Sequence, residues 1–324
     1  MDPATNRLTR QVLPEVTAAL DPSRPYLPSS PYVSPEMFAR GGDQHLGPEQ
    51  HLWGPRDYYK SNFYARNTAC FASEMGYHGC PNVASIRRFI SPAALWPWQN
   101  NHEWQVHSTD PMVGISHIRY RIKLMADQLM EVFGCIPEDL DTYALASQIV
   151  QAEAKKFFVE IFRQQKWRTS GILWWNMIDG WPQFSDAIVD YYFGRKLAYH
   201  YLKRVHGPVC IIVGEPDNWN CRVTACNDSR ESVQGRFTIR DADSAAILLE
   251  GPLAIPANAN AGLGQIRAPR GVQKLFLIEW DANGTRGVNH YLLGTPPFDL
   301  ERYRGWLHSL AALDGSFDPD TVGQ

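Results

Sequence analysis

Residues 71–80 read FASEMGYHGC and place a single carboxylate, Glu74, between a run of small and apolar residues and a glycine. The longer run, residues 67–76, predicts a short buried strand with Glu74 near its C-terminal end. Two further apolar runs, residues 25–31 and 170–179, also end in polar side chains. In a barrel of alternating strands and helices, the C-terminal ends of the strands carry the active site. The sequence therefore predicts a site at these strand ends.

Segments with helical periodicity accompany these strands, and they are residues 8–20, 113–134, 142–166 and 194–205. In the third segment, apolar side chains recur at spacings of three and four residues, which is typical of an amphipathic helix. Strands that alternate with helices favour an α/β fold with parallel strands. We therefore expect residues 1–206 to have the architecture of a (β/α) barrel.

The pattern changes after residue 206. Short β-like runs follow one another, separated by Gly, Pro, Asn and Asp, and Asn283-Gly284 is typical of a two-residue hairpin turn. This pattern predicts an antiparallel β-sandwich, immunoglobulin-like, at residues 207–296. Residues 297–324 are expected to form a C-terminal helix and a short tail.

Charge and hydropathy limit the classes of partner. The chain has 31 Lys and Arg against 34 Asp and Glu, whereas a protein that binds nucleic acid or an anionic membrane favours a basic face. No apolar run approaches the ~18–20 residues that span a bilayer. The first residues, MDPATNRLTRQ, lack the pattern of a secretory signal. We expect a soluble protein that binds neither nucleic acid nor a membrane, and its location stays open.

The six cysteines are scattered and show no CxxC spacing. We expect most of them to be small buried side chains rather than disulfides, and we expect no zinc site.

Aromatic residues are abundant, with 11 Trp, 14 Tyr and 14 Phe, and several lie beside polar side chains. Examples are the stretches HLWGPRDYY, LWPWQNNHEW and LWWNMIDGWP. One interpretation is dense core packing. The other is carbohydrate binding, because sugar rings stack on aromatic faces while their hydroxyls need hydrogen-bonding partners.

Glu74 also has two interpretations. A lone carboxylate commonly caps a turn or pairs with an arginine. A carboxylate at a barrel strand end can instead attack an anomeric carbon and form a glycosyl-enzyme intermediate that water hydrolyses.

Several motifs, spread over residues 8–206, resemble glycoside hydrolase family 2 and particularly its β-mannosidase-like branch. FASEMG is similar to the nucleophile strand of that family, the seventh of the barrel, and the run from Gly171 to Arg204 resembles the eighth strand and closing helix. LDPSRPYLPSSP resembles the fifth strand, and GGDQHLGPEQHLWG the loop after it. SQIVQAEAKKFFVEIFRQQKW is similar to the helix before the last strand. A β-sandwich after the barrel also fits the family.

The resemblance implies roles for individual residues. Glu74 would be the nucleophile, and Trp175 would stack on the sugar in the cleaved subsite. Asn176 would contribute to substrate binding. Asp43, His45 and Trp53 would contact substrate, although the residues between them differ from the family pattern. No metal or organic cofactor is implied.

The acid/base half of the reaction is not expected in this chain. A retaining hydrolase uses a second carboxyl about 5–5.5 Å from the nucleophile. In the family this residue is a Glu after an Asn on the fourth strand, and no Asn-Glu pair precedes the fifth-strand motif. The expected fold is thus the C-terminal half of a (β/α)8 TIM barrel, strands 5–8, followed by the sandwich.

Two functions follow as hypotheses. The first is a retaining, exo-acting, β-mannosidase-like hydrolase of terminal β-linked sugars, with an upstream polypeptide completing the barrel. The alternative is a non-catalytic carbohydrate-binding or assembly fragment of a split or degenerate enzyme.

Overall fold

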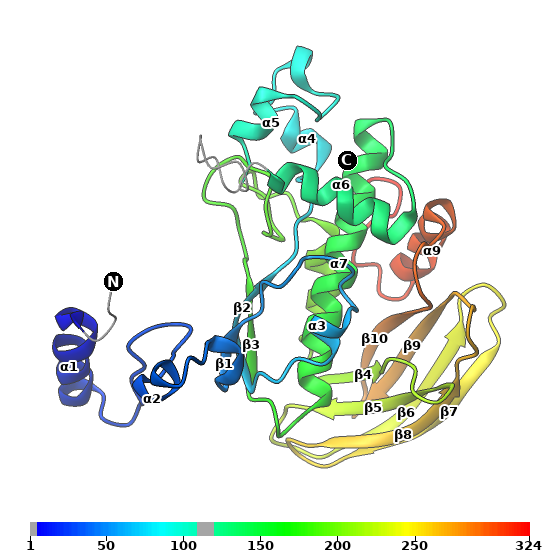
Figure 1. Cartoon of the computed structure of the whole chain (residues 1–324). Helices are drawn as coiled ribbons and strands as arrows, with labels where there is room; N and C mark the ends of the chain where they lie inside the picture. Colours follow the sequence, from blue (N-terminus) through cyan, green and yellow to red (C-terminus); the bar gives the residue numbers. More distant parts are fainter. Residues whose placement is uncertain (1–4, 109–119) are drawn as a thin grey trace.

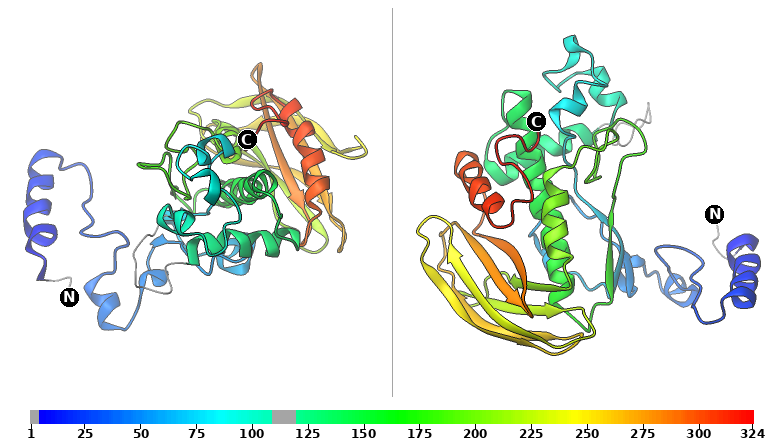
Figure 2. Two further views of the ribbon diagram at one scale, coloured as in Figure 1. Left: turned by 90° about the horizontal axis from the view of Figure 1, so that it is seen from above. Right: turned by 180° about the vertical axis from the view of Figure 1, so that it is seen from behind.

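The computed structural model describes residues 5–108 and 120–324. A small parallel sheet and a cluster of helices form one part, and two antiparallel sheets form the other, with the long helix α7 between them (Figure 1). Figure 2 shows the N-terminal helix α1 standing apart from both parts.

The parallel sheet has the strand order β1-β2-β3, with β1 at Glu49–His51, β2 at Phe71–Gly76 and β3 at Gly171–Trp175. Both neighbours of β2 pair with it in parallel. The strands predicted within residues 67–76 and 170–179 are therefore present.

The strand predicted at residues 25–31 is wrong, because these residues form turns and coil. Three of the seven are proline, which cannot donate to a strand ladder. The first strand of the sheet is instead β1, which lies in the segment expected to be a loop. The described residues thus hold three parallel strands rather than the four expected.

The helices predicted at residues 8–20, 142–166, 194–205 and in the C-terminal segment are present, whereas the short helices between residues 35 and 106 were not predicted. In chain order they are η2 (Leu8–Val12), α1 (Leu13–Leu20), α2 (Pro35–Ala39), η3 (Gln44–Leu46), α3 (Asn62–Ala65), α4 (Val83–Ile86), η4 (Pro92–Ala94), α5 (His102–Val106), α6 (Tyr120–Phe133), α7 (Leu140–Gln164), α8 (Leu197–Val205) and α9 (Leu300–Ala312). The start of the helix predicted at 113–134 lies outside the described residues. No helix of the described part is long and apolar enough to cross a membrane.

The second part contains seven antiparallel strands, namely β4 (Val209–Val213), β5 (Asn220–Asn227), β6 (Val233–Asp241), β7 (Ile247–Ile255), β8 (Asn260–Arg267), β9 (Lys274–Ala282) and β10 (Thr285–Leu293). They form one sheet of order β10-β9-β6-β7 and another of order β4-β5-β8. Asn283 and Gly284 join β9 to β10 with positive φ at both residues, as the sequence predicts. An antiparallel sandwich is therefore present.

Helix α7 is the axis around which both parts pack. Asp139 caps its N-terminus by accepting a hydrogen bond from the Thr142 amide, and most of its side chains are buried. Because α7 is covered on several sides, some of its charged side chains are buried. These side chains form hydrogen bonds and ion pairs with one another and with the sandwich. Glu160 bonds Lys156 on the same helix and Asn289 of β10.

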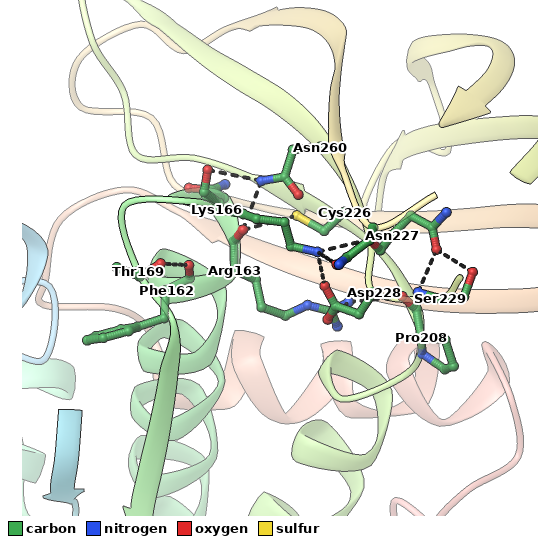
Figure 3. Close-up of polar contacts among 12 residues, drawn as sticks. Phe162, Arg163, Lys166, Thr169, Pro208, Cys226, Asn227, Asp228, Ser229 and Asn260 are labelled. Carbon is green, nitrogen blue, oxygen red and sulfur yellow. Dashed lines mark hydrogen bonds and ion pairs between the residues drawn. The ribbon is translucent and has the colours of Figure 1, made fainter. Parts of the chain in front are cut away.

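The C-terminal end of α7 is fastened to the sandwich by side-chain donors (Figure 3). The Asn260 amide of β8 donates to the carbonyls of Arg163 and Gln164 at 2.9 and 3.2 Å. Lys166 reaches Asp228 and the carbonyl of Asn227. The two Asn260 bonds add donors to carbonyl groups of the last helical turn, where internal partners run out, and the Lys166 contacts tie the same segment to the sandwich.

All six cysteines are free, and Cys80, Cys210, Cys221 and Cys226 are buried. The prediction of mostly small buried thiols is confirmed.

Candidate functional site

Glu74 lies on β2, two residues before the strand ends, in the middle strand of the parallel sheet. The pairing of β2 with β3 is irregular between Ala72 and Met75, so the ladder is interrupted where Glu74 lies. Its side chain is 30% exposed and thus open to a ligand. A carboxylate that is held by a sheet and still reaches solvent suits chemistry better than core packing.

Two side chains, from the last residue of β1 and from the residue two positions beyond it, contact one oxygen of this carboxylate. The indole Nε1 of Trp53 donates to Glu74 Oε2 at 2.8 Å. His51 Nδ1 lies 3.3 Å from the same oxygen. Both contacts are to Oε2, and among the described residues no contact to Oε1 is found.

His51 connects Glu74 to a second carboxylate. Its Nε2 lies 3.0 Å from the Ser30 hydroxyl, which in turn donates to Glu49 Oε1 at 2.6 Å. Glu49 also accepts bonds from the Ser73 hydroxyl and, at 2.6 Å, from the Tyr32 amide. Burial acts to raise the pKa of Glu49, but these hydrogen bonds and the nearby His51 outweigh it, so the pKa is held below its ordinary value.

Trp175 ends β3 and is 46% exposed. Its ring meets that of Trp53 edge to face, with centroids 6.5 Å apart. The two tryptophans therefore lie beside each other at the strand end that carries Glu74.

Asn176 faces its own loop. Its amide points to the carbonyl of Ile178 at a long 3.5 Å, and its backbone carbonyl accepts from the Ile188 amide. In the described contacts Asn176 does not reach Glu74.

Asp43 and His45 do not join Glu74 within the described contacts. Both are exposed, and Asp43 accepts a hydrogen bond from the His45 amide at 2.9 Å. The imidazole of His45 packs edge to face on Phe63. The side chains that contact the Glu74 carboxylate are instead Trp53 and His51.

Sequence reasoning missed Glu49 and His51 because a three-residue strand of polar side chains makes no apolar run. One signal was available. Glu49, His51 and Trp53 are spaced by two, and alternate residues of a strand point to the same face.

The described residues contain no group of three or more His, Cys, Asp or Glu that could hold a metal ion. The chemistry that the arrangement itself offers is that of a carboxylate next to exposed aromatic faces.

Comparison with protein-family models gives no match. Among curated proteins, β-mannosidase B of Aspergillus terreus and of Aspergillus niger are each 28% identical over 218 residues, which is 65% of this chain and 24% of theirs. The chain therefore spans about a quarter of the length of these relatives.

Solved structures show the same relationship. The β-D-mannosidase of Dictyoglomus thermophilum matches with a TM-score of 0.73 and 27% identity, over 91% of this chain and 35% of that one. An exo-chitosanase of Amycolatopsis orientalis matches with a TM-score of 0.64 over 93% of this chain and 38% of that one; at 17% identity it supports the fold alone.

Sequence and fold together relate this chain, over part of their length, to the β-mannosidase-like glycoside hydrolases of family 2.

Proposed function

We propose that this chain is the C-terminal part of a retaining, exo-acting glycoside hydrolase that cleaves terminal β-linked sugars of the mannoside type. The observation that carries the proposal is the position of Glu74. Its side chain is 30% exposed near the end of a parallel strand, Trp53 donates a hydrogen bond to it, and the exposed Trp175 lies next to Trp53. In this proposal residues 1–206 are the C-terminal half of a TIM barrel, residues 207–296 an immunoglobulin-like sandwich and residues 297–324 a helix and tail.

The first chemical step is assigned to Glu74. Its free oxygen attacks the anomeric carbon, the bond to the leaving group breaks, and a glycosyl-enzyme ester forms. The Trp53 indole orients the carboxylate through Oε2. The exposed ring of Trp175 stacks on the sugar that is cleaved off. Water then hydrolyses the ester, and Glu74 is restored.

The leaving group must also receive a proton from a second carboxyl. Two other carboxylates lie near this strand end, Glu49 and the buried Asp186, and hydrogen bonds and charged neighbours hold the pKa of each below its ordinary value despite burial. A general acid needs the opposite shift, because it must keep its proton near neutral pH. We therefore assign the acid/base catalyst to polypeptide outside this chain.

The same polypeptide would complete the barrel at β3. This strand lies at an edge of the parallel sheet and leaves Leu173 58% exposed. A groove of about 560 Å³ beside it is lined mainly by apolar side chains from β3 and α8, among them Ile172, Trp174 and Leu202. An unpaired edge with an apolar flank suits the addition of a further strand and helix.

The test measures release of nitrophenol from p-nitrophenyl β-D-mannoside by the chain complemented with an upstream polypeptide or within its full-length form. Glu74→Gln should lower kcat by roughly 10⁴-fold, because the nucleophile is removed. The matched control is Glu250→Gln, an exposed carboxylate on β7 of the sandwich, which should keep full activity. Unchanged turnover in Glu74→Gln would remove the proposed nucleophile.

A non-catalytic carbohydrate-binding or assembly fragment is the second candidate. It is favoured by the open edges of the three-stranded sheet and by the bonded state of Glu49. Calorimetric titration with methyl β-D-mannoside separates the two. This candidate is favoured over the enzyme if the sugar binds, Trp175→Ala abolishes the binding, and neither the complemented chain nor its full-length form hydrolyses the nitrophenyl mannoside.

A further inference from the structure

Behind the two tryptophans of the candidate site lies a buried group of charged residues to which the proposed chemistry assigns no role. Its centre is Lys155 of α7, which has no exposed surface. The Lys155 ammonium donates to the backbone carbonyl of Trp175, the residue that ends β3. The same nitrogen lies 5.3 Å from the ring of Trp174. Lys155 therefore holds the backbone from which the exposed indole extends.

A second connection runs to Trp53. The guanidinium of Arg56 lies over the Trp53 ring at 4.5 Å, and one of its nitrogens is 4.0 Å from Asp186 Oδ1. Asp186 is 2% exposed and interacts electrostatically with Lys155. The Asp186 carboxylate thus interacts both with Arg56, which packs on the Trp53 ring, and with Lys155, which bonds the backbone of Trp175.

Gly76 shows how closely these parts approach. A Cβ at this position would lie 2.8 Å from Asp186 Oδ1, 2.8 Å from the Trp53 ring and 3.0 Å from the Trp175 carbonyl. All three groups surround Gly76 of β2, the strand that carries Glu74. Because the space is filled, a shift of one group displaces the others.

The charges around Lys155 come from several elements. Asp186 favours its charged form, whereas Lys196 and Arg56 oppose it. His78 and Arg121 also face the Asp186 end of the group. Burial is the largest cause, followed by these charges, and together they lower the pKa of Lys155 to about 7.

We propose that Lys155 is a positioning residue, whose ammonium, with Asp186 and Arg56, holds the indoles of Trp175 and Trp53 in place at the strand end of Glu74. The role of the two rings in this inference rests on the proposed sugar site, whereas the contacts of Lys155, Asp186 and Arg56 do not depend on it. Loss of the positive charge weakens the hydrogen bond to the Trp175 carbonyl, because a neutral amine is a poorer donor than an ammonium, and it leaves Asp186 with one cation fewer, so both rings change position.

The experiment uses the full chain labelled with 5-fluorotryptophan, with ¹⁹F spectra recorded from pH 6 to 9. Trp53→Phe and Trp175→Phe assign the two signals. In the wild type, the Trp175 signal should move with a midpoint near pH 7. Lys155→Met should abolish this movement and fix the signal at its high-pH position. Lys155→Arg, which keeps its charge throughout the range, should fix it near the low-pH position.

Lys203→Met is the matched control, since Lys203 is an exposed lysine on α8. It should leave both signals and their pH dependence as in the wild type. A Trp175 signal that titrates equally in the wild type and Lys155→Met overturns the proposal. If Lys155→Met does not fold, the wild-type and Lys155→Arg titrations decide, because equal movement in these two excludes Lys155 as the source.

Sugar binding separates this inference from the proposed function. Titration of methyl β-D-mannoside into the same variants should show affinity reduced by about 10- to 100-fold in Lys155→Met and largely retained in Lys155→Arg. Absence of binding to the wild-type chain would count against the sugar site. The ligand-free ¹⁹F result would still decide whether Lys155 positions the two rings.

Discussion

Gly76 is the residue at which the candidate site has least room. The Asp186 carboxylate, the Trp53 ring and the Trp175 carbonyl already lie within 3.0 Å of the place that a Cβ would take. The Trp53 ring and the Trp175 carbonyl are also held by the buried cations Arg56 and Lys155. A methyl group therefore has no space unless a neighbour moves.

Gly76→Ala should lower the free energy of unfolding by about 1–3 kcal/mol, the usual cost of overpacking a well-filled interior. It should also move Trp53, whose ring is one of the crowded neighbours. Urea unfolding measures the first effect, and the ¹⁹F signal of Trp53 measures the second. Gly180→Ala is the control, because a Cβ at Gly180 meets nothing within 4 Å. Equal stability of the two variants would show that the space at Gly76 is larger than described.

For single residues of the candidate site, the predictions came from the local sequence pattern and from the family resemblance. Glu74 follows an apolar run and was visible as a strand-end residue, whereas Trp175, Trp53, Asp43 and His45 were assigned through the family resemblance. In the structure Trp53 bonds Glu74, and Asp43 accepts a hydrogen bond from the His45 amide. Substrate contact by these residues stays a prediction. The role of Lys155 could not be predicted, because a lysine within a helix looks solvent-exposed until the packing around all sides of α7 is known.

Among the elements, the end of α7 has the most specific attachment. Asn260 supplies two hydrogen bonds to carbonyls of the last helical turn, from a strand almost a hundred residues away in the sequence. The strand and the helix end thus support each other.

Asn260→Ala should lower the free energy of unfolding by about 1–3 kcal/mol, because partly buried helix carbonyls lose their donors. Gln265→Ala on the same strand is the control, since that side chain is exposed. Thermal unfolding followed by circular dichroism measures both. A loss in Gln265→Ala as large as in Asn260→Ala would point to the strand rather than to the helix end.

Elements with strong periodicity were the predictable ones. Helix α7 and six of the seven sandwich strands have clear apolar patterns, and the hairpin at Asn283 has turn residues that require positive φ. Strand β8 escaped prediction because it contains Gly262 and Gly264, which have low strand propensity. Strand β1 escaped because its pairing with β2, a tertiary contact, forms it rather than its own composition.

For the whole molecule, one buried cluster joins α7, the sandwich and α9. Glu153 of α7 accepts bonds from His290 of β10 at 2.9 Å and from Tyr303 of α9 at 2.5 Å. His290 has no exposed surface, and burial lowers its pKa to about 4, whereas burial of Glu153 is outweighed by His290, Lys156 and Tyr303, so its pKa falls to about 2.

Stability should therefore fall in mild acid. Between pH 6.5 and 4 the unfolded chain protonates His290 while the folded chain does not, so protons favour unfolding over this window. The free energy of unfolding should decrease by on the order of 1–3 kcal/mol from this group as the pH falls. Glu153 adds to this loss only at the acid end of the window, because the unfolded chain protonates it near its ordinary pKa of 4.5, whereas the folded chain keeps it charged until the pH approaches about 2.

Urea unfolding at a series of pH values measures this decrease. His290→Gln should make the dependence between pH 6.5 and 4 shallower, with the remainder coming from other buried histidines such as His200, whose pKa is also lowered to about 4. His308→Gln, at an exposed histidine on α9, should leave the dependence unchanged. If His290→Gln has the wild-type slope, the acid sensitivity comes from another group.

The central position of α7 has a consequence for how the chain melts. Because α7 packs against both the parallel-sheet part and the sandwich, and the buried apolar side chains form one continuous cluster, both parts lose contacts once α7 unravels. The chain should absorb heat in a single calorimetric peak despite its two architectures. A gene cut near residue 206 would then separate the sandwich from the helix on which it packs.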